Sequence, residues 1–123
     1  MKMRKILIVE DNPVNRELLR ELLETRGFEV AEACNGEEAL QCMEAEKPHI
    51  LLLDLNMPVL DGFETVRRIR QHPAFMGLPV LAVTAYAMRG DREKILESGF
   101  DGYLSKPINP LALRQELDRL LNQ

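Results

Sequence analysis

The chain contains no tryptophan and only two cysteines among its 123 residues. Cys34 and Cys42 lack the CxxC spacing and the nearby histidines of a zinc site or redox pair. Two cysteines are also too few for a disulfide-stabilised fold. We therefore expect both to be reduced thiols, packed in or near the core of a cytoplasmic protein.

Long apolar segments and one-sided charge are also absent. The apolar run of residues 6–9 is much shorter than a signal-peptide core, and no later segment approaches the length of a membrane span. Sixteen Lys and Arg are mixed with twenty Asp and Glu, which gives a net charge of -4 without a basic stripe. We expect a soluble protein that binds neither nucleic acid nor a membrane directly.

The length of the chain fits one domain, residues 1–123. Apolar runs rich in branched residues predict strands at 6–9, 28–33, 49–55 and 78–85, and a weaker run predicts a fifth at 100–107. Continuous apolar runs of this kind are typical of strands in a parallel sheet that is covered on both faces.

Helical spacing appears between these runs. Val14, Leu18 and Leu22 recur every four residues, and Leu19 and Leu23 extend the same predicted apolar face. Asn or Asp precedes four of the predicted helices, and these side chains accept hydrogen bonds from the first free amides of a helix. The predicted caps are Asn12, Asn35, Asp61 and Asn109, with a fourth helix that opens at Gly90 or Asp91 and stops by Gly99.

Five strands that are each followed by a helix make a (βα)₅ pattern. Right-handed crossovers convert such a pattern into a parallel sheet with helices on both faces, a three-layer α/β sandwich. In an open α/β sheet, ligands bind beyond the carboxyl ends of the strands. The residues that end the predicted strands are therefore the candidates for a functional site.

Three carboxylates, a hydroxyl and an ammonium fall at those ends: Glu10, Asp11, Asp54, Thr84 and Lys106. Clustered carboxylates raise each other's pKa, so a cation is needed to neutralise them. Oxygen ligands without a thiol or imidazole indicate Mg²⁺, or Mn²⁺ as a substitute. An aspartate beside Mg²⁺ can accept a phosphoryl group covalently, which makes Asp54 a candidate phosphoacceptor.

Each of these residues has an ordinary structural explanation when it is considered alone. A single carboxylate at a strand end is more often a helix cap or a solvated loop residue, Thr84 a loop hydroxyl, and Lys106 a surface charge. The sequence does not decide whether the Lys106-Pro107 peptide bond is trans, the commoner form, or cis. The placement of these polar residues at the ends of four strands is what favours a functional site.

Four segments together resemble the receiver domain of two-component response regulators. They are LIVEDNPVNR, LLLDLNMPVLDG, AVTAYA and YLSKPI, and the resemblance extends from about residue 5 to residue 121. It implies a flavodoxin-like fold with the sheet order 2-1-3-4-5. It also favours a cis bond before Pro107.

The resemblance implies roles for the site residues. Asp54 would accept the phosphoryl group, with Asp11 and Asp54 as direct Mg²⁺ ligands and Glu10 acting through water. The Asn56 backbone carbonyl would be a further ligand. Thr84 and Lys106 would bind the phosphoryl oxygens, and Tyr103 would change rotamer together with Thr84 on activation.

The implied function is a phosphorylation-dependent signalling switch. The donor would be a phosphohistidine on a sensor histidine kinase or a histidine phosphotransfer protein. The face formed by the fourth helix, fifth strand and fifth helix would contact a downstream protein effector. The chain would catalyse only its own phosphoryl transfer and autodephosphorylation, as a monomer or a weak phosphorylation-dependent dimer.

Two alternatives remain open at the level of sequence. A Mg²⁺-dependent phosphohydrolase of the haloacid dehalogenase type also forms an aspartyl phosphate, but that family has a second Asp two residues after the nucleophile, where this chain has Asn56. The chain also resembles both stand-alone response regulators and receivers excised from hybrid histidine kinases.

Overall fold

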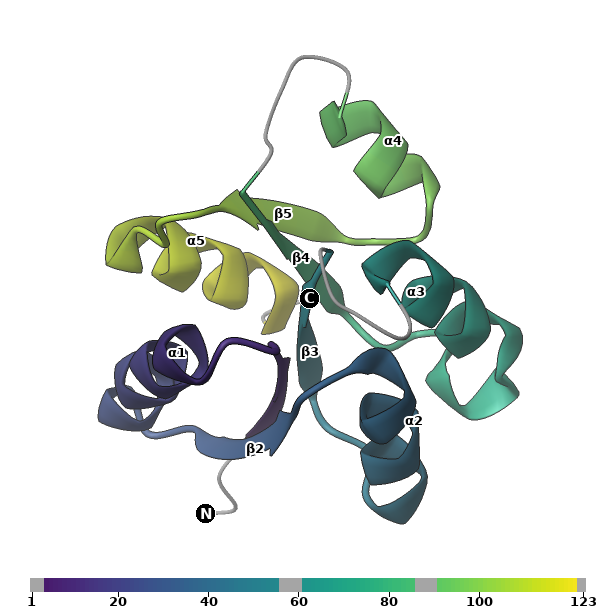
Figure 1. Ribbon diagram of the computed structural model, residues 1–123, viewed down its shortest axis with the longest axis horizontal. Helices are drawn as coiled ribbons and strands as arrows, with labels where there is room; N and C mark the ends of the chain where they lie inside the picture. Colours follow the sequence, from purple (N-terminus) through teal and green to yellow (C-terminus); the bar gives the residue numbers. More distant parts are fainter. Residues whose placement is uncertain (1–3, 56–60, 86–90, 122–123) are drawn as a thin grey trace.

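A computed structural model describes residues 4–55, 61–85 and 91–121 (Figure 1). The strands are β1 (Lys5–Val9), β2 (Glu29–Ala33), β3 (Ile50–Asp54), β4 (Val80–Thr84) and β5 (Gly102–Ser105). The helices are α1 (Pro13–Thr25), α2 (Gly36–Ala45), α3 (Gly62–Gln71), α4 (Asp91–Glu97) and α5 (Pro110–Leu121), with a short 3-10 turn, η1 (Pro73–Phe75), before β4. Strands and helices alternate, as the sequence predicted.

The five strands form one parallel sheet in the order β2-β1-β3-β4-β5. This order confirms the flavodoxin-like arrangement implied by the sequence resemblance. The chain reverses its direction of travel across the sheet after β2, since β3 pairs with the other side of β1. The ends of β1 and β3 therefore lie side by side at the point where a ligand is expected.

Helices cover both faces of the sheet (Figure 1): α1 and α5 lie on one face, and α2, α3 and α4 on the other. Side chains alternate between these faces along each strand. In β3, for example, Leu52 packs with α1 and α5, whereas Leu53 packs with the other three helices. Double coverage explains why β3 reads as an almost unbroken apolar run.

The predicted helix caps are confirmed at all four positions. The side chain of Asn12 accepts hydrogen bonds from the amides of Val14 and Asn15. Equivalent bonds are made by Asn35 to Glu38, by Asp61 to Glu64, and by Asn109 to Leu111 and Ala112. These side chains satisfy amides that have no partner within the helix.

The predicted apolar face of α1 is only partly correct. Leu19 and Leu23 are buried against the sheet, but Val14 is 73% exposed and Leu18 is 52% exposed. Successive helical residues are about 100° apart around the axis, so the Leu18 stripe lies to one side of the Leu19 stripe, and only Leu22 of the Leu18 stripe packs partly against the core. The helix buries the second stripe, and Val14 and Leu18 form an exposed apolar edge.

The prediction that both cysteines pack in or near the core was wrong for Cys34. Cys42 on α2 is half-buried and packs against the core, whereas Cys34 is exposed. Cys34 follows Ala33, the last paired residue of β2, and so lies beyond the region that α2 covers. Both are free thiols.

Within the described ranges, no helix has the length and apolar character needed to cross a membrane.

Candidate functional site

The strand register places the candidate residues in one row at the carboxyl edge of the sheet. Val9 is paired with Leu53, so Glu10 and Asp54, the next residues of the two strand paths, lie side by side. Thr84, the last residue of β4, is paired with Ser105, which directly precedes Lys106. Pairing of neighbouring strands thus brings together residues that are far apart in the sequence.

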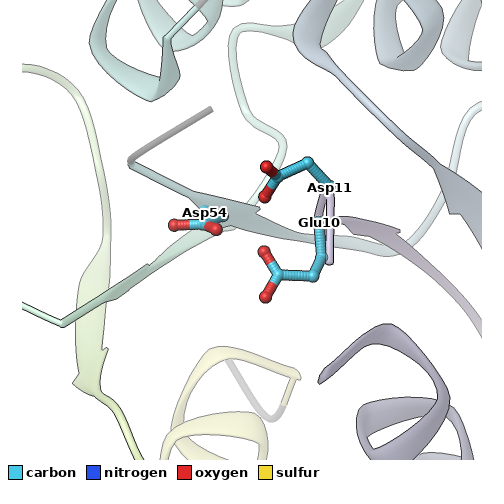
Figure 2. A group of neighbouring side chains, drawn as sticks. All are labelled: Glu10, Asp11 and Asp54. Carbon is cyan, nitrogen blue, oxygen red and sulfur yellow. The ribbon is translucent and has the colours of Figure 1, made fainter. Parts of the chain in front are cut away.

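Three carboxylates point toward a common space at this edge (Figure 2). Glu10, Asp11 and Asp54 each offer an oxygen, and these oxygens lie within 4.8 Å of one another. Glu10 and Asp54 are buried, each 2% exposed, whereas Asp11 is exposed. The cluster therefore opens to solvent on the Asp11 side, which is the side from which a ligand can enter.

Lys106 joins this cluster from the end of β5. Its ammonium Nζ lies 3.0 Å from Oδ2 of Asp54 and 3.1 Å from Oε1 of Glu10. The Lys106-Pro107 peptide bond is cis, the form that the sequence resemblance favours. Four of the sequence-predicted residues, Glu10, Asp11, Asp54 and Lys106, are thus brought together.

The electrostatics of the cluster favour an added cation. Burial, the hydrogen bond to Asp54 and the Asp54 charge raise the pKa of Glu10 from 4.5 to about 7, although Lys106 opposes this shift. Burial lowers the pKa of Lys106, but its bonds to Asp54 and Glu10 outweigh that effect, so its pKa is raised. One ammonium does not neutralise three carboxylates.

Glu10 also has an unsatisfied oxygen. Among the described residues, its buried Oε2 atom has no hydrogen-bond partner. Buried carboxylate oxygens are normally paired, because loss of hydration costs free energy that a partner must recover. An unpaired oxygen that is grouped with the carboxylates of Asp11 and Asp54 fits a hard divalent cation such as Mg²⁺.

Thr84 and Tyr103 lie on the opposite face of the sheet from Lys106. Thr84 is buried at the end of β4, and Tyr103 is half-buried in β5, where it pairs with Ala82. Because side chains alternate, Ala82, Thr84 and Tyr103 share the face that carries α4. Asn56, the predicted source of a further metal ligand, lies outside the described residues.

Sequence reasoning missed Arg16 on α1, whose guanidinium Nη1 donates to the backbone carbonyl of Glu10 at 2.9 Å. One weak signal was available. A cation in the first turn of a helix opposes the helix dipole, which favours negative charge there. An arginine placed just after the acidic pair of Glu10 and Asp11 therefore suggests a specific contact.

A doubly wound α/β fold with an acidic cluster at the switch point defines a class of ligand-binding or phosphoryl-binding domains. The comparison with protein families makes the class specific, because the response regulator receiver domain family matches residues 6–118. The chain belongs to this family, which is a family of two-component signalling domains.

Curated relatives include both stand-alone and multidomain proteins. An uncharacterized 14.6 kDa protein of Leptolyngbya boryana is 48% identical over 118 residues, covering 96% of this chain and 87% of that protein. The polar-differentiation response regulator DivK of Brucella anthropi is 39% identical and covers 86% of each chain. The hybrid signal transduction histidine kinase I of Dictyostelium discoideum is 43% identical over 94% of this chain, which spans only 7% of that kinase.

Solved structures of receiver domains superpose closely on this fold. The receiver domain of the sensor histidine kinase PA1611 of Pseudomonas aeruginosa has a TM-score of 0.91 and 35% identity, covers 99% of this chain and 100% of its own, and has a magnesium ion coordinated in its active-site cleft. The Ssk1 receiver domain of Saccharomyces cerevisiae, crystallised with the histidine phosphotransfer protein Ypd1, has a TM-score of 0.88 and 31% identity, covering 96% of this chain and 88% of that one.

Proposed function

We propose that Asp54 accepts a phosphoryl group from a phosphohistidine and that the resulting aspartyl phosphate changes the protein contacts of this domain. The observation that carries the proposal is the position of Asp54. Its carboxylate is grouped with those of Glu10 and Asp11 and lies 3.0 Å from the ammonium of Lys106. The Asp54 carboxylate therefore lies next to negative charge that would bind a metal ion and next to positive charge that would bind a phosphoryl group.

Mg²⁺ fits the acidic side of this site, with Mn²⁺ as a substitute. Glu10, Asp11 and Asp54 would hold the ion, and the backbone carbonyl of Asn56 remains a predicted further ligand. When bound, the ion would neutralise negative charge on the incoming phosphoryl oxygens. Support comes from the unpaired Oε2 atom of Glu10 and from the magnesium ion in the related PA1611 receiver domain.

The transfer itself forms one bond and breaks one. A carboxylate oxygen of Asp54 attacks phosphorus, the O–P bond forms, and the N–P bond to the donor's imidazole breaks. The imidazole leaves with the electron pair of that bond. Lys106 contacts the Asp54 carboxylate and would stabilise charge on the phosphoryl oxygens. The hydroxyl of Thr84, at the end of the neighbouring strand, would do the same.

A groove beside the site fits the histidine-bearing donor protein. It runs between α1 and the residues that follow β5, and its apolar lining is formed by Leu18, Leu19, Leu22, Pro107 and Ile108. Glu10 and Lys106 of the site line the same groove. A donor must bring its phosphohistidine to Asp54, so a surface continuous with the site is the natural docking surface. The related complex of Ypd1 with Ssk1 supports a phosphotransfer protein or a histidine kinase as the partner.

The output would be a population shift between two conformations. Phosphorylation adds roughly one negative charge and new acceptor oxygens to Asp54. Charge-assisted bonds contribute about 1.5 to 3 kcal/mol each, so two or three approach the roughly 5.5 kcal/mol that turns a 1:99 equilibrium into 99:1. Thr84 would move toward the phosphoryl group, Tyr103 would fill the space behind it, and the face of α4, β5 and α5 would contact the effector.

The family match favours this signalling function over a haloacid dehalogenase type of hydrolase. The catalytic activity that we propose for the chain, besides its own phosphorylation, is autodephosphorylation, which needs no separate substrate. A weak phosphorylation-dependent dimer and a receiver that forms part of a hybrid kinase are both compatible with the proposal. The free thiols of Cys34 and Cys42 suit a cytoplasmic location.

Incubation with acetyl phosphate and Mg²⁺, followed by intact-mass measurement, tests the proposal. We expect one phosphoryl adduct on the wild type and none on Asp54→Asn. Asp61→Asn is the matched control, because Asp61 is in the same segment but caps α3, and it should gain the adduct normally. An adduct of equal amount on Asp54→Asn, or none on the wild type, would refute the assignment.

A further inference from the structure

Arg16 connects helix α1 to the acidic end of β1 through a backbone contact. Its Nη1 atom donates to the carbonyl oxygen of Glu10 at 2.9 Å, and its Nε atom lies 3.8 Å from a carboxylate oxygen of Glu32 on β2. Its side chain is 19% exposed, so it is largely shielded from water. The guanidinium is therefore held between the strand end and the neighbouring strand.

The peptide that Arg16 contacts lies between two of the three site carboxylates. The Glu10 carbonyl and the Asp11 amide belong to one planar peptide unit, so the orientation of this carbonyl limits the directions open to both side chains. On its other side, the amide of Glu10 donates to the carbonyl of Ala33 at 3.1 Å. Strand β2 and Arg16 thus hold Glu10 from both sides.

From this geometry we infer that Arg16 is a positioning residue for the metal site. It fixes the Glu10-Asp11 peptide so that both carboxylates face Asp54 before any ligand arrives. A guanidinium donor makes a stronger hydrogen bond to a carbonyl than a neutral donor does. Glu32 orients the guanidinium in turn. The inference rests on the proposed Mg²⁺ site.

Arg20 provides a matched control one turn further along α1. It also binds Glu32, with Nη1 to Oε1 at 3.0 Å, and it donates to the carbonyl of Val30 at 3.4 Å and pairs with Glu24 at 3.3 Å. It connects the same helix to the same strand, but the partners described for it are Glu24, Val30 and Glu32, and not Glu10. Loss of Arg20 therefore tests α1–β2 attachment without a direct effect on the acidic pair.

The experiment is a titration of ¹⁵N-labelled protein with Mg²⁺ alone, followed by amide chemical shifts. We expect Arg16→Gln to weaken Mg²⁺ binding by about 10-fold, the lower end of the range for residues that orient metal ligands. Arg16→Lys should recover part of this loss, since its ammonium still donates to a carbonyl. Arg20→Gln should bind Mg²⁺ as the wild type does.

A second measurement needs no metal. In the Mg²⁺-free protein, hydrogen exchange at the Glu10 amide, which donates to the Ala33 carbonyl, should accelerate in Arg16→Gln and not in Arg20→Gln. Unchanged affinity in Arg16→Gln, or equal losses in both variants, would overturn the positioning role. If the wild type itself bound no Mg²⁺, the metal part of the proposed function would fail, and exchange at the Glu10 amide would still decide whether Arg16 holds this segment.

Discussion

The ammonium of Lys106 lies 3.0 Å from Oδ2 of Asp54, although the two residues are 52 positions apart and their strands are not adjacent in the sheet. Strand β4 lies between β3 and β5, so the lysine side chain reaches past one whole strand. The consequence is competition: the lysine stabilises the same carboxylate that a metal ion and a phosphoryl group would use.

Substitution Lys106→Met should therefore separate metal binding from phosphorylation. Without the competing ammonium, Mg²⁺ should bind about 10-fold more tightly, which corresponds to the loss of one charge-assisted hydrogen bond. Phosphorylation by acetyl phosphate should nevertheless slow, because the phosphoryl oxygens lose a cationic partner. An NMR titration with Mg²⁺ and a time course of intact mass measure the two effects.

The control for this prediction is Lys47→Met, since Lys47 is an exposed lysine in the loop before β3. It removes the same charge from the molecule without altering the site. Weaker Mg²⁺ binding in Lys106→Met would show that the lysine assists the metal site and would contradict the competition.

Glu10 should make the metal-free protein less stable as pH rises. Its folded-state pKa is raised from 4.5 to about 7, so the folded state favours the protonated form. The associated stability is fully present below pH 4.5 and is lost as pH rises through about 7. At about 1.4 kcal/mol per pKa unit, the loss is on the order of 3 to 4 kcal/mol.

Glu10→Gln should abolish this dependence. We expect the variant to exceed the wild type in unfolding free energy at pH 8 by about 3 kcal/mol without Mg²⁺. The two proteins should be nearly equal at pH 4.5, where the wild-type carboxyl is protonated in the folded state. Urea denaturation at both pH values measures this, and the exposed Glu17→Gln variant should show neither effect. A variant less stable than the wild type at pH 8 would refute the prediction.

Sequence reasoning predicted that Glu10, Asp11, Asp54 and Lys106 lie together, because each of them stands at the end of a strand. Parallel strands in register bring their carboxyl ends to one edge, so an apolar run that ends in Glu10 or Asp54 already locates the residue in space. The cap residues were predictable for a similar reason, since a cap acts within three residues of its own position. Rules that depend on nearby residues therefore predicted both the sheet edge at which the polar residues meet and the positions at which the helices begin.

Contacts made by long side chains could not be predicted in this way. Arg70 on α3 donates to the carbonyls of Leu78 and Gly99 and to the carboxylate of Asp101, and Arg16 reaches the Glu10 carbonyl. The Arg70 contacts leave no periodic or neighbouring signal in the sequence, and the Arg16 contact leaves only its position after the acidic pair. The exposed edge of α1 was missed for another reason: two adjacent leucine stripes are both apolar, and only packing selects one.

Gly62 at the start of α3 should be required for the geometry of Asp54. A Cβ atom at this position would lie 2.8 Å from the carbonyl oxygen of Asp54 and 2.8 Å from Cα of Leu55, both of them backbone atoms. We expect Gly62→Ala to lower the unfolding free energy by about 1 to 3 kcal/mol, as for other overpacked sites. Denaturant unfolding measures this loss.

The same substitution should slow phosphorylation, because the displaced backbone carries the phosphoacceptor. Gly77→Ala is the matched control, since among the described residues no atom beyond its two chain neighbours lies within 4 Å of the added Cβ. It should change the unfolding free energy by less than about 0.5 kcal/mol. If Gly62→Ala were phosphorylated at the wild-type rate despite lower stability, the close approach of α3 would serve packing alone.

Thr84 and Tyr103 should respond together when the site is filled. They share one face of the sheet, and Tyr103 pairs with Ala82, two residues before Thr84. Beryllofluoride with Mg²⁺ mimics the phosphoryl group on an aspartate. It should shift the amide resonances of residues in α4, β5 and α5 as well as those at the site.

Thr84→Val keeps the shape of the side chain and removes the hydroxyl that would bind the phosphoryl oxygens. In this variant, beryllofluoride should still shift resonances next to Asp54, but the shifts near Tyr103 should shrink, because nothing draws residue 84 inward to open space behind it. Equal shifts on the α4–β5–α5 face in both proteins would exclude Thr84 as the link. Unchanged resonances there in the wild type would show that Tyr103 is a static, half-buried aromatic and that this face does not report phosphorylation.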